Sequence, residues 1–218
     1  MPRKAREEAR RARTDVYRQH IVEAAEQVFA ERGFEPAKVQ EISKLAGLSM
    51  GTIYAIFPSK NDIFRAILEE RASELLAIVE EVVGRNEGPR EALHALIEAY
   101  IDYFLAHPSL LRMHLRLGSS WALRPGQDAE SRGEHWERIQ ELQAEIFRRG
   151  IAERVFVDED PIYLAKTFSV MDQVLLADWV ASGMKADRTV LVRRLQEMVD
   201  RAFGRPGPAN VRSAARSA

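Results

Sequence analysis

The chain has 218 residues, of which 46% are hydrophobic and 30% are charged, and its formal net charge is −1. A chain of this length and composition can bury a core and form one or two domains. The absence of cysteine excludes disulfides and thiolate metal sites. No apolar run approaches the roughly 18 residues of a membrane-spanning helix. The basic N-terminus lacks the apolar segment of a secretory signal, so we expect a cytoplasmic protein without a membrane partner.

Residues 1–13 form a basic arm without apolar periodicity, and we predict that this arm is disordered until DNA is near. It could follow a phosphate backbone or enter a minor groove, or it could be only a solubilising tail. Positive charge also dominates over a longer range, because residues 1–60 carry 11 Lys and Arg against 8 Asp and Glu. A DNA-binding protein with near-zero net charge needs such segregation.

Residues 14–60 predict a three-helix domain that displays one of its helices. The first helix can be capped by Thr14 and ends at Gly33; its apolar stripe consists of Ile21, Ala24, Ala25, Val28 and Phe29. Two short helices follow, at about 39–46 and 50–57, joined by a turn at Gly47.

The second short helix has the composition of a helix that touches DNA. Ser49 is a good N-cap, and Ile53 and Phe57 lie four residues apart on an inward face. Small, polar or amphipathic residues are left on the outward face: Met50, Gly51, Thr52 and Tyr54. This pattern predicts a helix-turn-helix whose second helix enters the major groove.

Lys60 opens the next predicted helix, which Ser59 can cap with Asp62 three residues on. The lysine ammonium gains nothing from the dipole at a helix N-terminus, where anions are favoured. A phosphate would suit both the lysine and the free backbone N–H groups. We therefore expect Lys60 to hold a DNA phosphate.

This part of the chain resembles the TetR family of transcriptional repressors over roughly residues 14–68. The matching elements are Ile21-x-x-Ala-Ala-x-x-x-Phe29, Gly33-Phe34, Ile42-x-x-x-Ala46-Gly47-Leu48-Ser49-x-Gly51-Thr52-Ile53-Tyr54-x-x-Phe57 and Ser59-Lys60-x-Asp62. The resemblance implies that Met50, Gly51 and Thr52 lie against base edges and that Tyr54 and Lys60 hold phosphates. It also implies nine helices and a dimer through the last two.

Two positions depart from the family pattern. Lys38 stands near the start of the first short helix, where a hydroxyl residue is usual; it loses the cap but can reach a phosphate. Ile56 replaces a usual His or Tyr, and it either packs or meets a thymine methyl. Two of these residues also have a purely structural interpretation: Tyr54 can be a half-buried tyrosine with no DNA contact, and Thr52 an ordinary surface residue. The predicted DNA contacts are Lys38, Ser49, Met50, Gly51, Thr52, Tyr54 and Lys60.

Residues 61–203 predict a helical effector-binding and dimerisation body, so the fold class is all-α. Helices are expected at about 59–84, 90–106, 109–117, 128–152, 162–182 and 188–203, with loops at 118–127 and 155–161. The tail, residues 204–218, is rich in Gly, Pro, Ser and Ala and is predicted to be disordered.

The penultimate helix is apolar on most of its circumference, so it must be covered on more than one side. One side would meet its own core and another a second subunit. The predicted dimer contacts are Leu176, Trp179, Leu191, Leu195 and Met198. A twofold dimer would present two recognition helices and predicts a palindromic operator.

Aromatic and methionine side chains in the body are candidates for the pocket of a small apolar or amphipathic effector. They are Tyr103, Phe104, Met113, His114, Trp121, Trp136, Phe168 and Met171. Each of them suits an ordinary core as well. Asp172 lies among apolar residues, where a lone carboxylate would be costly to bury. It can pair with an arginine across a dimer, lie at the surface, or bind a cationic or hydroxylated ligand.

These observations predict a DNA-binding transcriptional regulator, a repressor released by an effector. An activator, a ligand-independent or co-repressor-dependent regulator, and a protein-interaction module that does not bind DNA remain as alternatives. An enzyme is disfavoured, because the sequence has no paired metal spacing, no glycine-rich phosphate loop and no serine nucleophile elbow. We accordingly expect no cofactor, metal or catalytic residue.

Overall fold

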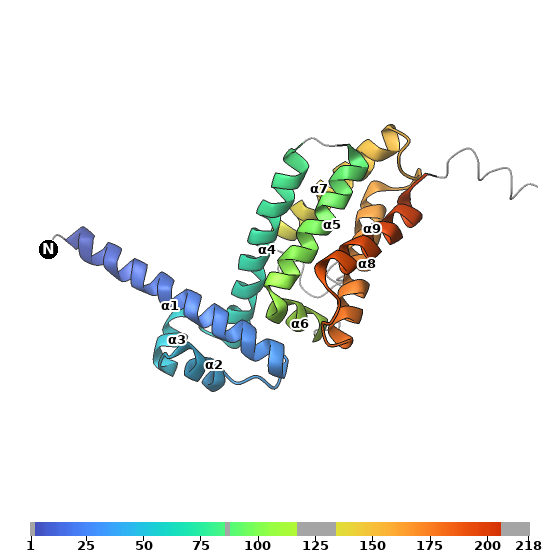
Figure 1. Ribbon diagram of the computed structural model, residues 1–218. Coiled ribbons are helices and arrows are strands. Elements are labelled where there is room, and N and C mark those ends of the chain that lie inside the picture. Colours follow the sequence, from blue (N-terminus) through green and yellow to red (C-terminus); the bar gives the residue numbers. More distant parts are fainter. Residues whose placement is uncertain (1–2, 86–87, 117–133, 206–218) are drawn as a thin grey trace, which may run out of the picture. The chain divides into compact units, whose positions relative to one another are not determined.

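The computed structural model describes residues 3–85, 88–116 and 134–205 (Figure 1). Within these ranges the chain forms nine helices: α1 (Arg3–Arg32), α2 (Val39–Ala46), α3 (Met50–Ile56), α4 (Lys60–Gly84), α5 (Pro89–Ala106), α6 (Pro108–Arg116), α7 (Glu134–Ala152), α8 (Pro161–Ala181) and α9 (Arg188–Phe203). The predicted all-α class is confirmed. None of the described helices is both long and apolar enough to cross a membrane.

The chain divides into two compact units. Of the described residues, 3–74 and 107–116 form the first unit, and 75–85, 88–106 and 134–205 form the second. The first unit therefore contains more than the predicted residues 14–60, because the start of α4 and the whole of α6 belong to it.

The core of the first unit lies where α1 packs against α2, α3 and α6. Phe29, Phe34 and Phe64 meet there with ring centroids 4.9 to 5.9 Å apart, as aromatic rings in cores prefer. Gly33 ends α1 in the left-handed conformation at φ 85°, where a side chain would be strained.

A buried ion pair joins α1 to α4 inside the same unit. Arg71 donates from Nε to Glu26 at 2.8 Å and from a terminal nitrogen to Glu74 at 2.8 Å. Burial lowers the pKa of Arg71, but the hydrogen bonds and charges of Glu26 and Glu74 outweigh burial and raise it above its ordinary value. Arg71 therefore stays charged, and Glu26 has its counterion within the core.

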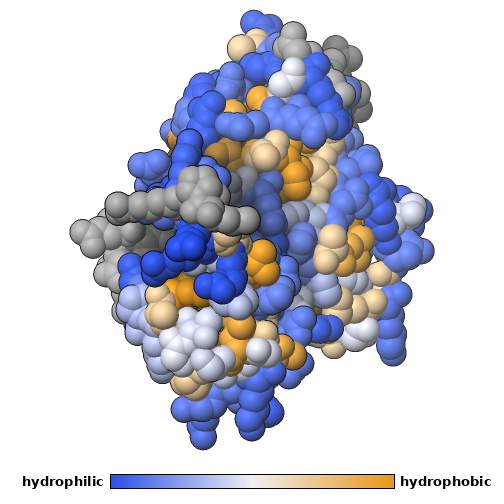
Figure 2. All heavy atoms as spheres, turned by 90° about the vertical axis from the view of Figure 1, so that its left-hand side faces the viewer, coloured by the Kyte–Doolittle hydropathy of each residue, from blue (hydrophilic) through white to orange (hydrophobic). Residues whose placement is uncertain are grey.

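The prediction of a disordered arm at residues 1–13 was wrong, since α1 begins at Arg3. Thr14 does not cap the helix either; its hydroxyl donates to the carbonyl of Arg10, 3.0 Å away, inside the helix. The arm consists largely of Arg, Glu and Ala, which favour helix, and extending a helix costs far less than nucleating one. Residues 6–16 are exposed. Hydrophilic and hydrophobic side chains are interspersed on the surface that Figure 2 shows.

In the second unit α7 packs against α5 and α8, and α9 packs against α5 and α8. The loop after α7 is held by Phe156, which packs against Phe147 with ring centroids 5.4 Å apart. Phe156 also forms an isolated β-bridge with Gly204. The predicted tail is thus ordered at its first two residues, and Arg205 donates its backbone N–H to Val155 at 3.0 Å. The rest of the tail, residues 206–218, lies outside the described residues.

Candidate functional site

The turn between α2 and α3 has the geometry that the sequence predicts. Gly47 adopts φ 67° and ψ 25°, the left-handed conformation that ends a helix. The hydroxyl of Ser43 donates to the carbonyl of Leu48 at 2.6 Å and braces the turn. At the start of α2, Lys38 supplies no cap, but Glu41 accepts its backbone N–H at 3.1 Å. One of the two hydrogen bonds of a capping box is therefore present although Lys38 replaces the usual hydroxyl residue.

Helix α3 has a buried face and an outward face. Ile53 is fully buried, whereas Tyr54 is 48% exposed and Gly51 is exposed. Ser49 caps the helix by accepting the backbone N–H of Thr52 at 3.1 Å, and the two hydroxyls lie 2.9 Å apart. The cap therefore orients the Thr52 side chain at the surface of the helix.

Met50 and Ile56, at the two ends of α3, are half-buried. For Ile56 this position agrees with the packing interpretation and still leaves part of the side chain accessible.

Lys60 does not have the free ammonium that the sequence led us to expect. Its Nζ donates to three backbone carbonyls, those of Phe34 at 2.7 Å, Glu35 at 3.0 Å and Ala37 at 3.2 Å. It also lies 4.5 Å from the centre of the Phe34 ring. Because an ammonium has three donors, these contacts use all of them. In this structure Lys60 therefore fastens the segment after α1 to the start of α4, and its phosphate contact stays a prediction.

Other cations of the first unit remain at the surface. Lys38 and Lys44, near the two ends of α2, are both exposed. Arg18 of α1 is exposed as well, and its guanidinium lies 4.8 Å from the centre of the Phe57 ring, just after α3. Lys44 was not singled out from the sequence, and Arg18 was noted only as one of the basic residues near the N-terminus. The sequence does contain a signal for the position of Arg18, since it lies three residues before Ile21 and so shares a face of α1 with the apolar stripe.

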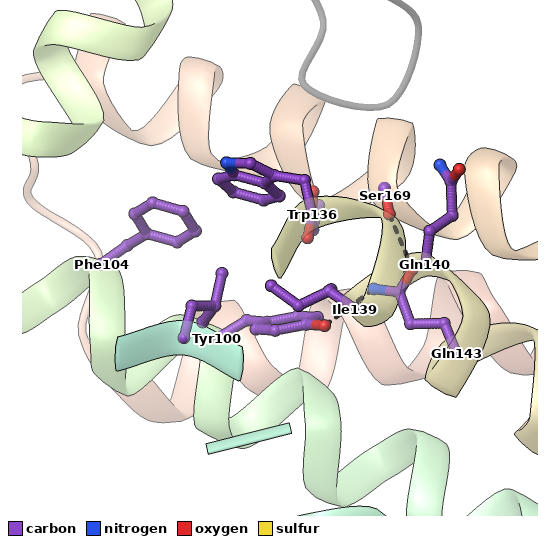
Figure 3. A pocket seen from close by; sticks show the side chains of 9 residues that line it. Tyr100, Phe104, Trp136, Ile139, Gln140, Gln143 and Ser169 are labelled. Carbon is purple, nitrogen blue, oxygen red and sulfur yellow. Dashed lines mark hydrogen bonds between the residues drawn. The ribbon is translucent and has the colours of Figure 1, made fainter. Parts of the chain in front are cut away.

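A second candidate site is a pocket within the second unit, between α5, α7 and α8 and the part of α4 that belongs to this unit (Figure 3). The described lining residues are Leu75, Tyr100, Phe104, Trp136, Ile139, Gln140, Gln143, Ser169 and Asp172. An apolar pocket with a few convergent polar groups is the usual form of a small-molecule site.

Three of the predicted effector residues line this pocket: Phe104, Trp136 and Asp172. Tyr103 and Phe168 belong to the buried core of the same unit, and Met171 is half-buried on α8. Met113 and His114 are buried on α6, which belongs to the first unit. Trp121 lies outside the described residues. The predicted set therefore mixed pocket residues with core residues.

The polar side of the pocket was missed, although its spacing is regular. Gln143 donates to the hydroxyl of Tyr100 at 2.7 Å, and Ser169 donates to Gln143 at 3.2 Å (Figure 3). Burial, and then the negative charge of Asp172, raise the pKa of Tyr100 above its ordinary value, so its phenol stays neutral. Tyr100 precedes Phe104 by four residues and Ser169 precedes Asp172 by three, so each pair shares a helix face.

The predicted dimer contacts are mostly internal. Four of them are buried within the second unit: Leu176, Trp179, Leu191 and Leu195. Their own unit therefore already covers most of each side chain, and their contact with a second copy stays a prediction. Met198 is half-buried. Helix α8 leaves two large hydrophobic side chains exposed, Tyr163 at 62% and Val174 at 59%.

The described residues hold no cluster of three or more His, Asp or Glu side chains that could ligate a metal.

Comparison with known proteins agrees with the geometry of the first unit. The family model described as "Bacterial regulatory proteins, tetR family" matches residues 21–67. The HTH-type transcriptional activator FasR of Mycolicibacterium smegmatis is 33% identical over 95 residues, which cover 44% of this chain and 43% of FasR. The chain thus spans less than half the length of this curated relative.

Solved structures extend the likeness to most of the chain. FadR of Bacillus subtilis, solved with stearoyl-CoA, has a TM-score of 0.70 at 22% identity, covering 83% of this chain and 96% of FadR. A regulator structure from Saccharomonospora viridis, solved with choline, has a TM-score of 0.70 at 21% identity and covers 87% of this chain and 98% of that one. At these identities the likeness concerns the fold. The family model over residues 21–67 and the match to FasR show that the chain belongs to the TetR family of transcriptional regulators.

Proposed function

We propose that this chain is a sequence-specific DNA-binding regulator that reads DNA with α3. The observation that carries the proposal is the outward face of α3, where short and hydroxylated residues are accessible while Ile53 and Phe57 are buried. Such a face lets the helix backbone approach the floor of a major groove. Met50, Gly51 and Thr52 would meet base edges, with Ser49 fixing the first turn of α3.

Phosphate contacts in this proposal come from groups that are free to make them. Tyr54 offers an exposed hydroxyl, and Lys38 and Lys44 offer exposed ammonium groups near the two ends of α2. Residues 6–16 of α1 add exposed arginines, which could follow the backbone as a helical arm. Lys60 has no part in the proposal.

We further propose that the protein acts as a homodimer on a palindromic operator. The exposed apolar side chains of α8, above all Tyr163 and Val174, favour a second copy as the cover of this face. A twofold axis would present two α3 helices to successive major-groove faces. The DNA partner also implies a location in the cytoplasm.

The pocket of the second unit is the proposed effector site, and release of the operator the proposed response. An effector can cause release only if it binds the DNA-incompetent state more tightly than the competent one. A repressor needs only to occupy its operator, so repression is the simpler proposal. The name of FasR favours activation as the second candidate.

The test is selection from a random duplex pool at physiological salt without added ligand. We expect enrichment of a palindrome. Thr52→Ala should change base preference at one half-site position, whereas Lys44→Ala should weaken all sites alike and reduce the salt slope by about 0.9. Glu31→Gln, an exposed change near the end of α1, serves as the control that alters neither. A folded protein that enriches no sequence and binds DNA without salt dependence would refute the proposal in favour of an interaction module.

A further inference from the structure

The N-terminal part of α1 is a helix that continues beyond the packed core of the first unit. Figure 1 shows it projecting past α2 and α3, and residues 6–16 are exposed along it. We call residues 3–16 the helical arm. A helix rises about 1.5 Å per residue, so the helical arm is about 20 Å long. Since its described side chains are exposed, they are available to a partner.

Charge is segregated around this part of α1. At about 100° per residue, the described basic side chains fall within one half of the circumference: Lys4, Arg6, Arg10, Arg11, Arg13 and Arg18. We call these six residues the basic face. The opposite half carries Glu8, Ala9, Ala12, Asp15 and Val16. Of the acids of the helical arm, only Glu7 lies in the same half as the basic face, which therefore has a large excess of positive charge.

Arg18 fixes the direction in which the basic face points. Its guanidinium lies 4.8 Å from the centre of the ring of Phe57, the residue that ends α3. Arg11 and Lys4 precede Arg18 at intervals of seven residues, and a straight helix drifts by only about 20° over seven residues. The line of α1 that contacts the end of α3 at Arg18 therefore continues along the helical arm as basic side chains.

The cations of the basic face are not neutralised by other described parts of the chain. Four arginine side chains form no hydrogen bond or ion pair with any described residue: Arg6, Arg10, Arg11 and Arg13. Arg18 has the ring of Phe57 beside it, which attracts a cation but has no oxygen to accept its N–H groups. An arginine donates in a planar fork that matches the oxygens of a phosphate. The basic face therefore offers several such forks to phosphates along one line.

We propose that the basic face of α1 binds the phosphate backbone of DNA beyond the bases that α3 reads, as a fixed helix and not as a flexible tail. Tyr54, a proposed phosphate contact with an exposed side chain, precedes Phe57 by three residues and so lies beside it on α3. Arg18 thus adds to the phosphate contacts at this end of α3. The helical arm extends them by about 20 Å, or about six base pairs of B-DNA. The inference rests on the proposed DNA-binding function and adds flanking DNA as a partner of α1.

The opposite half of the helical arm argues against a membrane surface as this partner. Helices that lie on membranes bury large side chains such as Trp, Phe or Leu on the face opposite their charges. The helical arm offers Ala9, Ala12 and Val16 there, which can bury little apolar area. Its affinity must therefore come mainly from charge, as in binding to a phosphate backbone.

The test moves positive charge around the helix without changing its amount. Residues 9–12 are Ala-Arg-Arg-Ala, and the relocated variant combines Ala9→Arg, Arg10→Ala, Arg11→Ala and Ala12→Arg. It has the same composition as the wild type but carries both arginines on the opposite half. Alanine and arginine are both strong helix formers, so circular dichroism should show unchanged helicity. DNA binding of the full chain is measured at about 50 and 200 mM salt, on the selected palindrome with and without about six more base pairs on each side.

We expect relocation to remove two phosphate contacts per chain and to reduce the salt slope by about 1.8 per bound chain. Over this range of salt, the wild type should then lose about twelvefold more affinity per bound chain than the variant. The wild type should also prefer the longer duplex by about tenfold, and the variant should lose this preference. Arg18→Gln leaves the helical arm intact and should reduce the slope by about 0.9.

Equal salt slopes for the wild type and the relocated variant would overturn the proposal, because a flexible basic tail depends on the amount of charge and not on its position around a helix. Equal affinity of the wild type for the short and the long duplex would overturn it as well. Vesicles rich in phosphatidylglycerol test the competing partner. If relocation weakened binding to vesicles and left DNA binding unchanged, the basic face would belong to a membrane surface instead.

Selection from the random duplex pool, on the same preparations, separates this proposal from the proposed regulator. If the wild type enriches a palindrome but gains nothing from flanking DNA, the regulator stands and the contact of the helical arm falls. If it enriches no sequence while relocation still reduces the salt slope on any duplex, the contact stands and the sequence-specific regulator falls.

Discussion

Arg71 is the point at which a single substitution should most destabilise the first unit. Its side chain is 11% exposed and lies 2.8 Å from the carboxylate of Glu26, which is 7% exposed. Its second partner, Glu74, is 40% exposed. Replacing Arg71 by Met fills a similar volume but leaves the Glu26 carboxylate in the core without its cation.

The expected loss follows from the burial of each partner. Removing one member of a buried ion pair costs about 3–5 kcal/mol, mostly because the other charge stays desolvated. The exposed partner, Glu74, is hydrated without Arg71, so its share is below about 1 kcal/mol. We therefore expect Arg71→Met to lower the free energy of unfolding by about 3–5 kcal/mol, and Glu74→Gln to lower it by less than about 1 kcal/mol.

Urea unfolding followed by circular dichroism measures these changes, and the double variant provides the sharper comparison. Glu26→Leu with Arg71→Met removes both charges from the core, so most of the loss should be recovered. The two single losses would then exceed the loss in the double variant by several kcal/mol. Two results would show that Arg71 does not compensate the charge of Glu26. One is a loss of stability below about 1 kcal/mol for Arg71→Met, and the other is a loss in the double variant equal to the sum of the losses in the two single variants.

The contacts of Lys60 predict that Lys60→Met lowers the free energy of unfolding of the first unit by about 2 kcal/mol or more and leaves the salt slope of DNA binding unchanged. Lys44→Ala should instead reduce the salt slope and leave the stability unchanged. If Lys60→Met changed only the salt slope, Lys60 would be a phosphate contact after all. Gly150→Ala would place a methyl group on the ring of Phe156, so urea unfolding should show a loss of about 1–3 kcal/mol, and a neutral result would mean that the ring moves aside freely. Tyr100→Phe should cost about 1 kcal/mol at neutral pH. Folding raises the pKa of Tyr100 above 10.0, so the free energy of unfolding of the wild type falls as the pH rises above that value. The difference in stability between the wild type and Tyr100→Phe should therefore become smaller there. A difference that grows with pH would contradict the raised pKa of Tyr100.

The helices were predictable because their apolar stripes repeat at the helical period, and the boundaries that glycine marks were predictable too. Gly33 and Gly47 adopt positive φ where the sequence places the ends of helices. The basic arm was not, because it has no stripe to read. A solvent-exposed helical segment that continues a packed helix forms because extending an existing helix costs little. Such a segment needs no apolar stripe, so its sequence has no apolar periodicity.

Lys60 illustrates a contact that local reasoning cannot find. Its position at a helix N-terminus suggested a free ammonium seeking an anion. The actual partners are carbonyls of residues 34, 35 and 37, more than twenty positions earlier in the chain. Only the packing of α4 beside the end of α1 brings them within reach.

Helix α8 marks a second limit. Apolar residues around most of its circumference indicate that it is covered on several sides, but they do not show which side meets which neighbour. Leu176 and Trp179 looked like interface residues and are core, whereas Val174 is exposed. Asp172 was recognised as unusual, but Tyr100 and Gln143 were missed, because regular spacing shows which residues share a helix face and not that a cavity lies beside that face.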